Sequence, residues 1–126
     1  MRLLLILLLS LSLYGSDYEH HSERHINKEL SHLHLTTSQK REVKSLLKAF
    51  RVELKAYRRY KKRIKRERQE LFLQDQFDVD TFNALNRRID QEAHAIESRF
   101  LMKMHKILTE RQRVRFIHYF DDWEVK

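Results

Sequence analysis

The sequence predicts an all-α protein folded as an elongated helical hairpin, and three observations support this. The chain of 126 residues contains no Pro and a single Gly, Gly15, so it lacks the residues that tight β-hairpin turns need. Apolar residues recur at spacings of three, four and seven along most of the chain, which is the period of one helix face. The third observation is a pattern, LTxxQ, that occurs twice.

Each LTxxQ copy is predicted to begin a helix. The Thr hydroxyl can accept a hydrogen bond from the backbone N–H of the Gln, and the Gln side chain can accept one from the backbone N–H of the Thr, which is a capping box. The preceding Leu lies where the chain turns, so its burial would fix the angle between successive helices. The two copies consist of Leu35, Thr36 and Gln39, and of Leu108, Thr109 and Gln112.

The first long helix is predicted from about Thr36 to Leu73. Its apolar stripe is interrupted by Lys61 and Arg68 and consists of Val43, Leu47, Phe50, Leu54, Tyr57, Ile64 and Leu71. At ~1.5 Å per residue such a helix is about 55 Å long, so the monomer must be thin. A thin hairpin leaves apolar surface that a second copy can cover, and we therefore expect a homodimer.

Two further helices complete the predicted domain. Asp78 and Asp80 can cap a second helix that starts near Asp80 and continues into the second LTxxQ copy. The stripe of this helix consists of Phe82, Leu85, Ile89, Ala93, Ile96, Phe100, Met104 and Ile107. The last helix follows Thr109, and we expect its inward residues to be Val114, Ile117, Phe120 and Trp123.

Residues 1–16, MRLLLILLLSLSLYGS, are predicted to be a secretory signal peptide. One Arg precedes an apolar run, and small and polar residues follow it, which is the order of regions in such signals. The apolar run is shorter than the ~20 residues that a membrane anchor needs. We therefore expect export with cleavage, a His-rich segment over residues 17–34, and an LTxxQ helical domain over residues 35–123.

The paired LTxxQ motifs in a small, Cys-free, helical chain with an export signal resemble the Spy/CpxP family of periplasmic proteins. Relatives of that family include the zinc-associated ZraP proteins and CnrX-type metal sensors. The resemblance implies a periplasmic location and about four helices in a bent hairpin that dimerises into a cradle. It also implies either ATP-independent binding of unfolded envelope proteins or contact with the periplasmic domain of a sensor kinase.

A dense basic run, KAYRRYKKRIKRER, lies within the first long helix and holds nine Lys or Arg in 14 residues. Like charges at such spacings repel one another, so the run is either a solvated face relieved by nearby carboxylates or a surface kept for a partner. In the second case its cations attract acidic segments of an unfolded client. The same composition would also suit the phosphates of nucleic acid or an anionic membrane. An exported protein rarely meets nucleic acid, so we expect no nucleic acid as a partner. The predicted client-binding residues are Lys55, Tyr57, Arg58, Arg59, Tyr60, Lys61, Lys62, Arg63, Lys65 and Arg66.

Histidines concentrate near the N-terminus, where five of the eight lie between His20 and His34. One helical face could present His21, His25, Glu29 and His32, which are spaced by four, four and three residues. Imidazoles at this spacing with a carboxylate can chelate Zn, Ni or Cu. The alternative is a His-rich segment without a ligand. His94, His105 and His118 are expected at the surface.

No constellation of catalytic residues is present, since the chain has no Cys and no Gly-rich loop. We therefore expect a protein that is not an enzyme and requires no cofactor. The leading prediction from the sequence is a periplasmic ATP-independent chaperone or envelope-stress adaptor. The alternative is a periplasmic divalent-metal-binding or metal-sensing protein of the metal-resistance type.

Overall fold

The computed structural model describes residues 28–126. The chain divides into an N-terminal unit, Met1–Leu35, and a second unit, Thr36–Lys126. In the second unit the elements are α2 (Thr37–Leu73), α3 (Val79–Ile107), α4 (Glu110–Phe116) and the 3₁₀ helix η1 (Ile117–Trp123). Every regular element of residues 28–126 is a helix, which confirms the all-α prediction.

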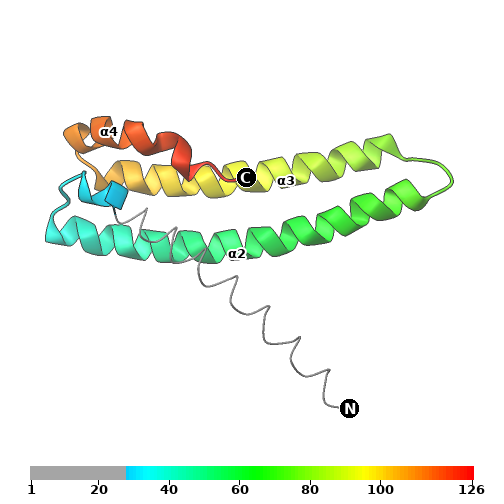
Figure 1. The fold of residues 1–126 in the computed structure, drawn as a ribbon, viewed down its shortest axis with the longest axis horizontal. Helices are drawn as coiled ribbons and strands as arrows, with labels where there is room; N and C mark the ends of the chain where they lie inside the picture. The colour runs from blue at the N-terminus through cyan, green and yellow to red at the C-terminus, as the bar shows by residue number, and fades with distance from the viewer. Residues whose placement is uncertain (1–27) are drawn as a thin grey trace, which may run out of the picture. The chain divides into compact units, whose positions relative to one another are not determined.

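The second unit is built on a hairpin of α2 and α3, which run antiparallel and are joined by a short turn (Figure 1). α2 has 37 residues and α3 has 29, so these two helices account for most of the unit. α4 and η1 then fold back along α3 (Figure 1). The predicted first helix, from Thr36 to Leu73, agrees with α2 to within one residue.

The turn between the two long helices ends at Asp78, which caps α3. Its carboxylate accepts hydrogen bonds from the Thr81 backbone N–H at 3.0 Å and from the Thr81 hydroxyl at 2.7 Å. These two hydrogen bonds lower the pKa of Asp78 below its ordinary value, and the bond from the backbone N–H has the larger effect. Because the pKa is lower in the folded chain, this contribution to stability is present above the unfolded-state pKa and is lost as the pH falls through the folded-state pKa.

The core of the hairpin lies between the facing stripes of α2 and α3, as the apolar spacing predicts. On α2 the buried residues are Val43, Leu46, Leu47, Phe50, Tyr57 and Ile64. On α3 they are Leu85, Ala93, Ile96, Phe100 and Met104. Burying such side chains removes apolar surface from water, which is the main stabilising contribution to a helical hairpin.

An aromatic cluster fastens the C-terminal segment to the hairpin. The ring of Trp123 stacks on Phe100 with centroids 4.7 Å apart, and Phe100 lies 4.5 Å from Phe50. Just beyond η1, the backbone N–H of Val125 donates to a Glu97 carboxylate oxygen at 3.2 Å. These contacts hold the C-terminal end against the middle of α3.

The predicted inward face of the last helix was largely wrong. Trp123 is buried as expected, but Val114 and Ile117 are 65 % and 64 % exposed, and Phe120 is exposed as well. The capping box turns Gln112 inward, and the buried residues that follow are Phe116 and Trp123. The apolar pattern does not identify this buried face, because the first buried residue of the helix, Gln112, is polar. The change to a 3₁₀ helix after Phe116 also shifts the period from 3.6 to about 3.0 residues.

Candidate functional site

Both LTxxQ motifs form the predicted capping boxes. The Thr36 hydroxyl accepts from the Gln39 N–H at 3.1 Å, and the Gln39 amide oxygen accepts from the Thr36 N–H at 2.9 Å. The Thr109 and Gln112 pair repeats these bonds at 3.3 and 2.9 Å. The two motifs therefore begin α2 and α4 by the same local chemistry.

The structure also joins the two motifs to each other, which explains why the pattern occurs twice. The Gln39 amide nitrogen donates to the Gln112 amide oxygen at 2.7 Å, and the Gln112 amide nitrogen donates to the Gln39 amide oxygen at 3.0 Å. Gln39 donates as well to the carbonyl of Ile107, the last residue of α3, at 2.9 Å. One amide pair thus connects the start of α2, the end of α3 and the start of α4. Leu108 is buried at this corner, whereas Leu35 is half-buried.

The predicted client-binding residues all lie on α2, but they do not share one surface. Tyr57 is only 4 % exposed and packs in the core. Its burial, together with the nearby carboxylates of Asp90 and Glu92, raises its pKa. Tyr57 is therefore a packing residue, and the prediction that it contacts a client from the surface is wrong.

The other predicted client-binding residues differ in exposure. Tyr60 and Lys61 are half-buried. The exposed residues are Lys55, Arg58, Arg59, Lys62, Arg63, Lys65 and Arg66. The ammonium of Lys61 lies 5.1 Å from the Tyr57 ring centroid and donates to the carbonyl oxygen of Lys126 at 2.9 Å. Lys61 thus interrupts the apolar stripe without an unpaired buried charge, because an aromatic face and a carbonyl oxygen surround it.

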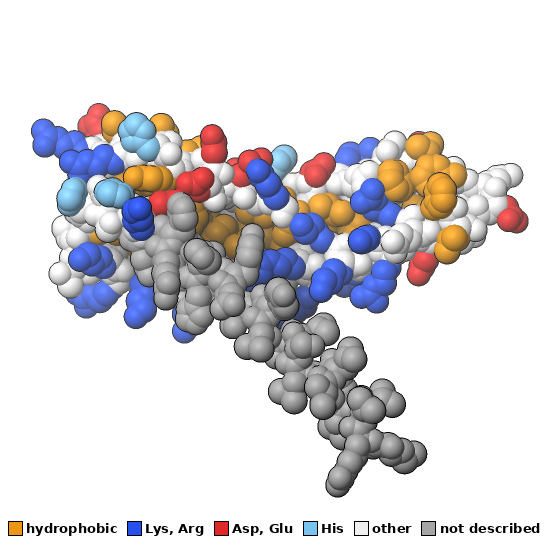
Figure 2. All heavy atoms as spheres, viewed as in Figure 1, with side chains coloured by type: hydrophobic (Ala, Val, Ile, Leu, Met, Phe, Trp, Pro, Cys, Tyr) orange, Lys and Arg blue, Asp and Glu red, His pale blue; other side chains and the backbone are white. Residues whose placement is uncertain are grey.

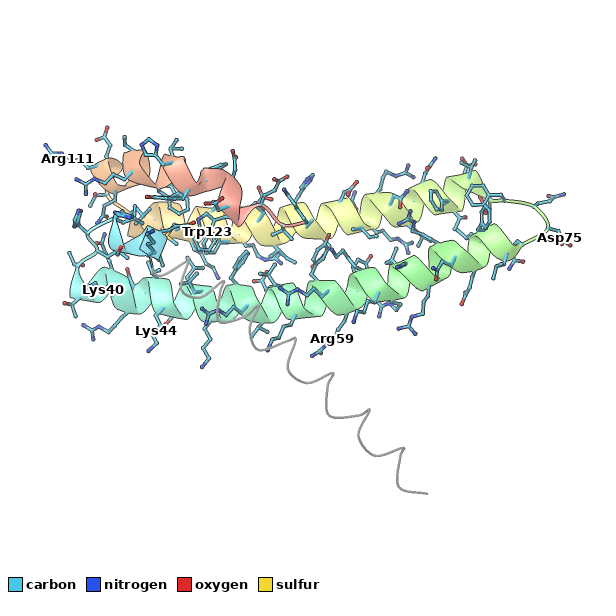
Figure 3. The ribbon with its side chains drawn as sticks, in the orientation of Figure 1. Lys40, Lys44, Arg59, Asp75, Arg111 and Trp123 are labelled. Carbon is cyan, nitrogen blue, oxygen red and sulfur yellow. The ribbon has the colours of Figure 1, made fainter. Side chains whose placement is uncertain are left out.

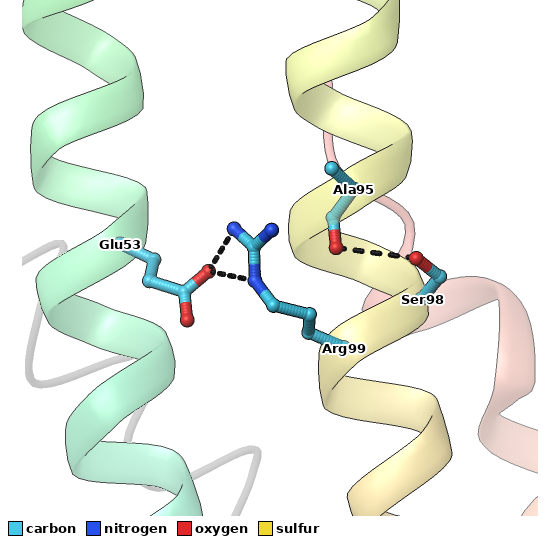
Figure 4. Close-up of polar contacts among 4 residues, drawn as sticks. All are labelled: Glu53, Ala95, Ser98 and Arg99. Atoms are coloured by element: carbon cyan, nitrogen blue, oxygen red, sulfur yellow. Dashed lines mark hydrogen bonds and ion pairs between the residues drawn. The ribbon is translucent and has the colours of Figure 1, made fainter.

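One ion pair links α2 to α3 across the hairpin. Arg99 donates through Nε and Nη2 to a single Glu53 carboxylate oxygen, at 3.2 and 2.8 Å (Figure 4). The hydrogen bonding of Arg99 to the Glu53 carboxylate is the main cause of a raised pKa at Arg99. Both side chains are partly exposed, so the pair orients the two helices more than it stabilises them.

An open groove of about 530 Å³ lies between α2 and α3 near the LTxxQ corner. Its apolar lining includes Leu46, Ala49 and Ile107, and its basic lining includes Lys103 and Lys106. The groove is too open to enclose a small molecule, and its lining offers no arrangement of groups for catalysis. Arg41, Glu42 and Ser45 complete the lining.

The predicted metal ligands all fall in the N-terminal unit. His21 and His25 lie outside the described residues, and Glu29 and His32 lie within them. Residues 28–31 are helical, and the His32 N–H donates to the Glu29 carbonyl at 3.3 Å, so Glu29 and His32 are one helical turn apart. Glu29 is largely buried and His32 is exposed. Among residues 28–126, no group of three or more His, Asp or Glu side chains is placed to hold a metal ion.

The three histidines of the second unit lie on its surface, as expected. His94 and His118 are exposed, and the Nε2 atom of His105 lies 3.2 Å from Nη1 of Arg113. Arg113 is the donor, because a guanidinium has no acceptor, and the contact is a hydrogen bond in the His105 tautomer whose Nε2 carries no proton. None of the three belongs to a candidate metal site within the described part of the chain.

The sequence analysis missed an exposed aromatic cluster at the hairpin turn. Phe77 lies 6.2 Å from Phe72 and 5.3 Å from Phe82, between ring centroids. Phe72 is 78 % exposed and Leu73 is 80 % exposed, and hydrophobic side chains gather at this end of the molecule (Figure 2). The Arg68 guanidinium lies 4.7 Å from the Phe82 ring centroid. The signal was the sequence LFLQDQFDVDTF, in which aromatic residues flank an Asp-rich turn.

The sequence profile of a family described as heavy-metal resistance matches residues 2–115 of this chain. No curated protein and no solved structure matches the chain. The family match agrees with the metal-resistance relatives in the resemblance drawn from the LTxxQ motifs, and the Spy/CpxP assignment stays a prediction. Among the helices of residues 28–126, none is long and apolar enough to cross a membrane.

Proposed function

The chain belongs to the heavy-metal resistance family, and from that premise we propose that it is a periplasmic protein that binds a divalent metal ion. The family match carries this proposal, because it spans both the His-rich segment and the LTxxQ hairpin. The Spy-like chaperone function, which was the leading prediction from the sequence, has no comparable support. Metal binding, the alternative prediction, therefore becomes the main proposal.

The proposed ligands are His21, His25, Glu29 and His32. Three imidazoles and one carboxylate are donors that suit a borderline-soft ion such as Zn, Ni or Cu. The described part of this set fits that role in spacing, since Glu29 and His32 lie one helical turn apart. The α2–α3 hairpin, whose corner is held by the Gln39–Gln112 amide pair, would follow the His-rich segment along the chain as a stable helical domain.

Calorimetric titration of the protein with Zn, Ni and Cu tests the metal proposal. We expect binding with a Kd below one micromolar for at least one of the ions, at one ion per chain. Because ligand histidines must lose their protons, the affinity should fall sharply as the pH drops through about 6.5. A His21→Ala/His25→Ala variant should bind at least 100-fold more weakly, since two of its four ligands are gone.

A His94→Ala/His118→Ala variant provides the matched control for this titration. It loses the same number of imidazoles, but from exposed positions on α3 and η1, and should bind as the unmodified chain does. Binding weaker than about 100 μM in the unmodified chain would contradict the proposal. Equal affinities in the two double variants would also contradict it, because the site would then not involve His21 and His25.

The exposed face of α4 and η1 is the best candidate for a homodimer contact. Val114, Ile117 and Phe120 recur every three residues and are all exposed. They form an exposed apolar strip, which is typical of an interaction surface. We expect light scattering to give twice the monomer mass, and an Ile117→Glu variant to give the monomer mass at the same concentration. A monomeric unmodified chain, or a variant that stays dimeric, would contradict this contact.

A second candidate function, the holding of unfolded proteins, is favoured by the exposed aromatic cluster at the hairpin turn. Phe72 and Leu73 offer apolar contacts without any pocket, which suits loose binding of unfolded chains. If this function is present, the protein should suppress aggregation of a denatured client at near-stoichiometric ratio. A Phe72→Ser/Leu73→Ser variant should lose most of that suppression, and a Val114→Ser variant should keep it. No suppression by the unmodified chain at low salt would exclude the function.

A further inference from the structure

A straight row of cations follows the outer face of α2, on the side turned away from α3. The row, which we call the basic row, consists of Lys44, Lys48, Lys55, Arg59, Lys62 and Arg66, all of them exposed. Their spacings of four, seven, four, three and four residues keep them on one helical face. At ~1.5 Å per residue the row is about 33 Å long. Figure 3 shows Lys44 and Arg59 pointing away from α3, and Figure 2 shows Lys and Arg along this edge of the hairpin.

The charges of the basic row are not neutralised by the rest of the described chain. None of the six side chains forms an ion pair or a hydrogen bond there. The acidic residue Glu53 is turned toward α3, where it pairs with Arg99. Like charges three and four residues apart destabilise a helix. An uncompensated row of six is more than solubility requires, so it suits an anionic partner.

The shape of this face indicates what kind of anion it fits. The face is the convex outside of a single helix, and its nearest aromatic residues are unavailable for stacking on bases or apolar segments. Tyr57 is in the core, and Tyr60 is half-buried with the Arg63 guanidinium 5.3 Å from its ring centroid. Nucleic-acid sites on single strands rely on exposed aromatic platforms, and sites for unfolded chains need apolar contact. A flat surface of closely spaced anions can contact a convex, straight row of cations. This contact needs neither aromatic platforms nor apolar side chains.

We propose that the basic row binds the surface of an anionic phospholipid bilayer. Clustered Lys and Arg near such a surface are attracted to its phosphates, and this attraction weakens with salt. Arg59, Arg63 and Arg66 also line one open depression with Tyr60, and its lining includes the carboxylates of Glu67 and Glu70 as well. Guanidinium groups match phosphate oxygens in a fork geometry, so this end of the row can hold a lipid headgroup. The apolar face of α2 stays against α3, which makes the contact peripheral and electrostatic.

Vesicle sedimentation tests this proposal. The full chain should bind vesicles of equal parts phosphatidylglycerol and phosphatidylcholine far better than vesicles of phosphatidylcholine alone, and high salt should abolish the preference. A variant with Lys44, Lys48, Lys55 and Lys62 all changed to Gln should lose about 30-fold or more in affinity for the anionic vesicles. Gln keeps helix propensity close to that of Lys, and circular dichroism should give the same helix content.

The matched control changes Arg87, Arg88, Arg111 and Arg115 to Gln. It also removes four positive charges, but from exposed positions outside α2. Its affinity for the anionic vesicles should stay within about threefold of that of the unmodified chain. All three proteins share residues 1–27, so any contribution of that segment cancels. Equal losses in the two variants would overturn the proposal, because net charge alone would then explain binding. Equal binding of the unmodified chain to the two kinds of vesicle would overturn it too, as would binding to polyglutamate without binding to anionic vesicles.

Discussion

Replacing Phe100 by Ala should lower the free energy of unfolding by about 3–5 kcal/mol, the largest loss expected for any single substitution in the hairpin. Phe100 is 2 % exposed, and its ring lies between Phe50 at 4.5 Å and Trp123 at 4.7 Å. Truncation removes the ring's burial and leaves a cavity at the point where α2, α3 and η1 meet. Chemical denaturation followed by circular dichroism measures the loss.

The size of this effect matters because small domains have only about 5–15 kcal/mol of stability in total. Phe72→Ala provides the control, since it removes the same ring from an exposed position at the hairpin turn and should change stability by about 0.5 kcal/mol or less. Loss of the near-ultraviolet signal of Trp123 should accompany unfolding of Phe100→Ala. A change below about 1 kcal/mol at Phe100 would contradict the aromatic cluster described above.

Replacing Gln112 by Ala should cost about 2–3 kcal/mol, which is unusually large for a polar residue. The substitution removes the acceptor for the Thr109 N–H, an effect of about 1 kcal/mol. It also removes the two hydrogen bonds to the Gln39 amide in a partly buried place. Gln39 keeps its bonds to Ile107 and Thr36, so the lost bonds cost a further ~0.5–1.5 kcal/mol each.

The pairing of the two motifs gives this prediction a sharper test. If Gln39 and Gln112 act as one amide pair, the losses from Gln39→Ala and Gln112→Ala should not add, and the double variant should be about 1 kcal/mol more stable than their sum predicts. Gln91→Ala, at an exposed position of α3, is the control and should have little effect. Additive losses would mean that the two capping boxes act independently.

The sequence predicts the two long helices well because their determinants are local. The Thr36 capping box and the Asp78 cap place the starts of α2 and α3 to within a residue or two, and the apolar period identifies their buried faces. The last helix was predicted less well. Its inward face begins with Gln112, a polar residue whose burial depends on a partner 73 residues away, and no local pattern reports such a partner.

The candidate sites depend on the sequence in different ways. The spacing of His21, His25, Glu29 and His32 suggests metal ligation directly, since those residues are close along the chain. Only four members of the basic row lie in the dense run of charge over residues 55–68. Recognising the whole row as one face requires knowing which side of α2 packs against α3. Tyr57 received two incompatible assignments from the sequence, one to the apolar stripe and one to the client-binding residues, and its burial agrees with the first.

X-ray absorption spectroscopy of the zinc-loaded protein tests the central claim, metal binding by the His-rich segment, most directly. The account predicts a first shell of nitrogen and oxygen atoms near 2.0–2.1 Å, with outer-shell scattering from about three imidazoles. In the His21→Ala/His25→Ala variant this imidazole scattering should fall to about one, whereas His94→Ala/His118→Ala should leave it unchanged. A spectrum without imidazole scattering, or one that the first variant does not alter, would contradict the account.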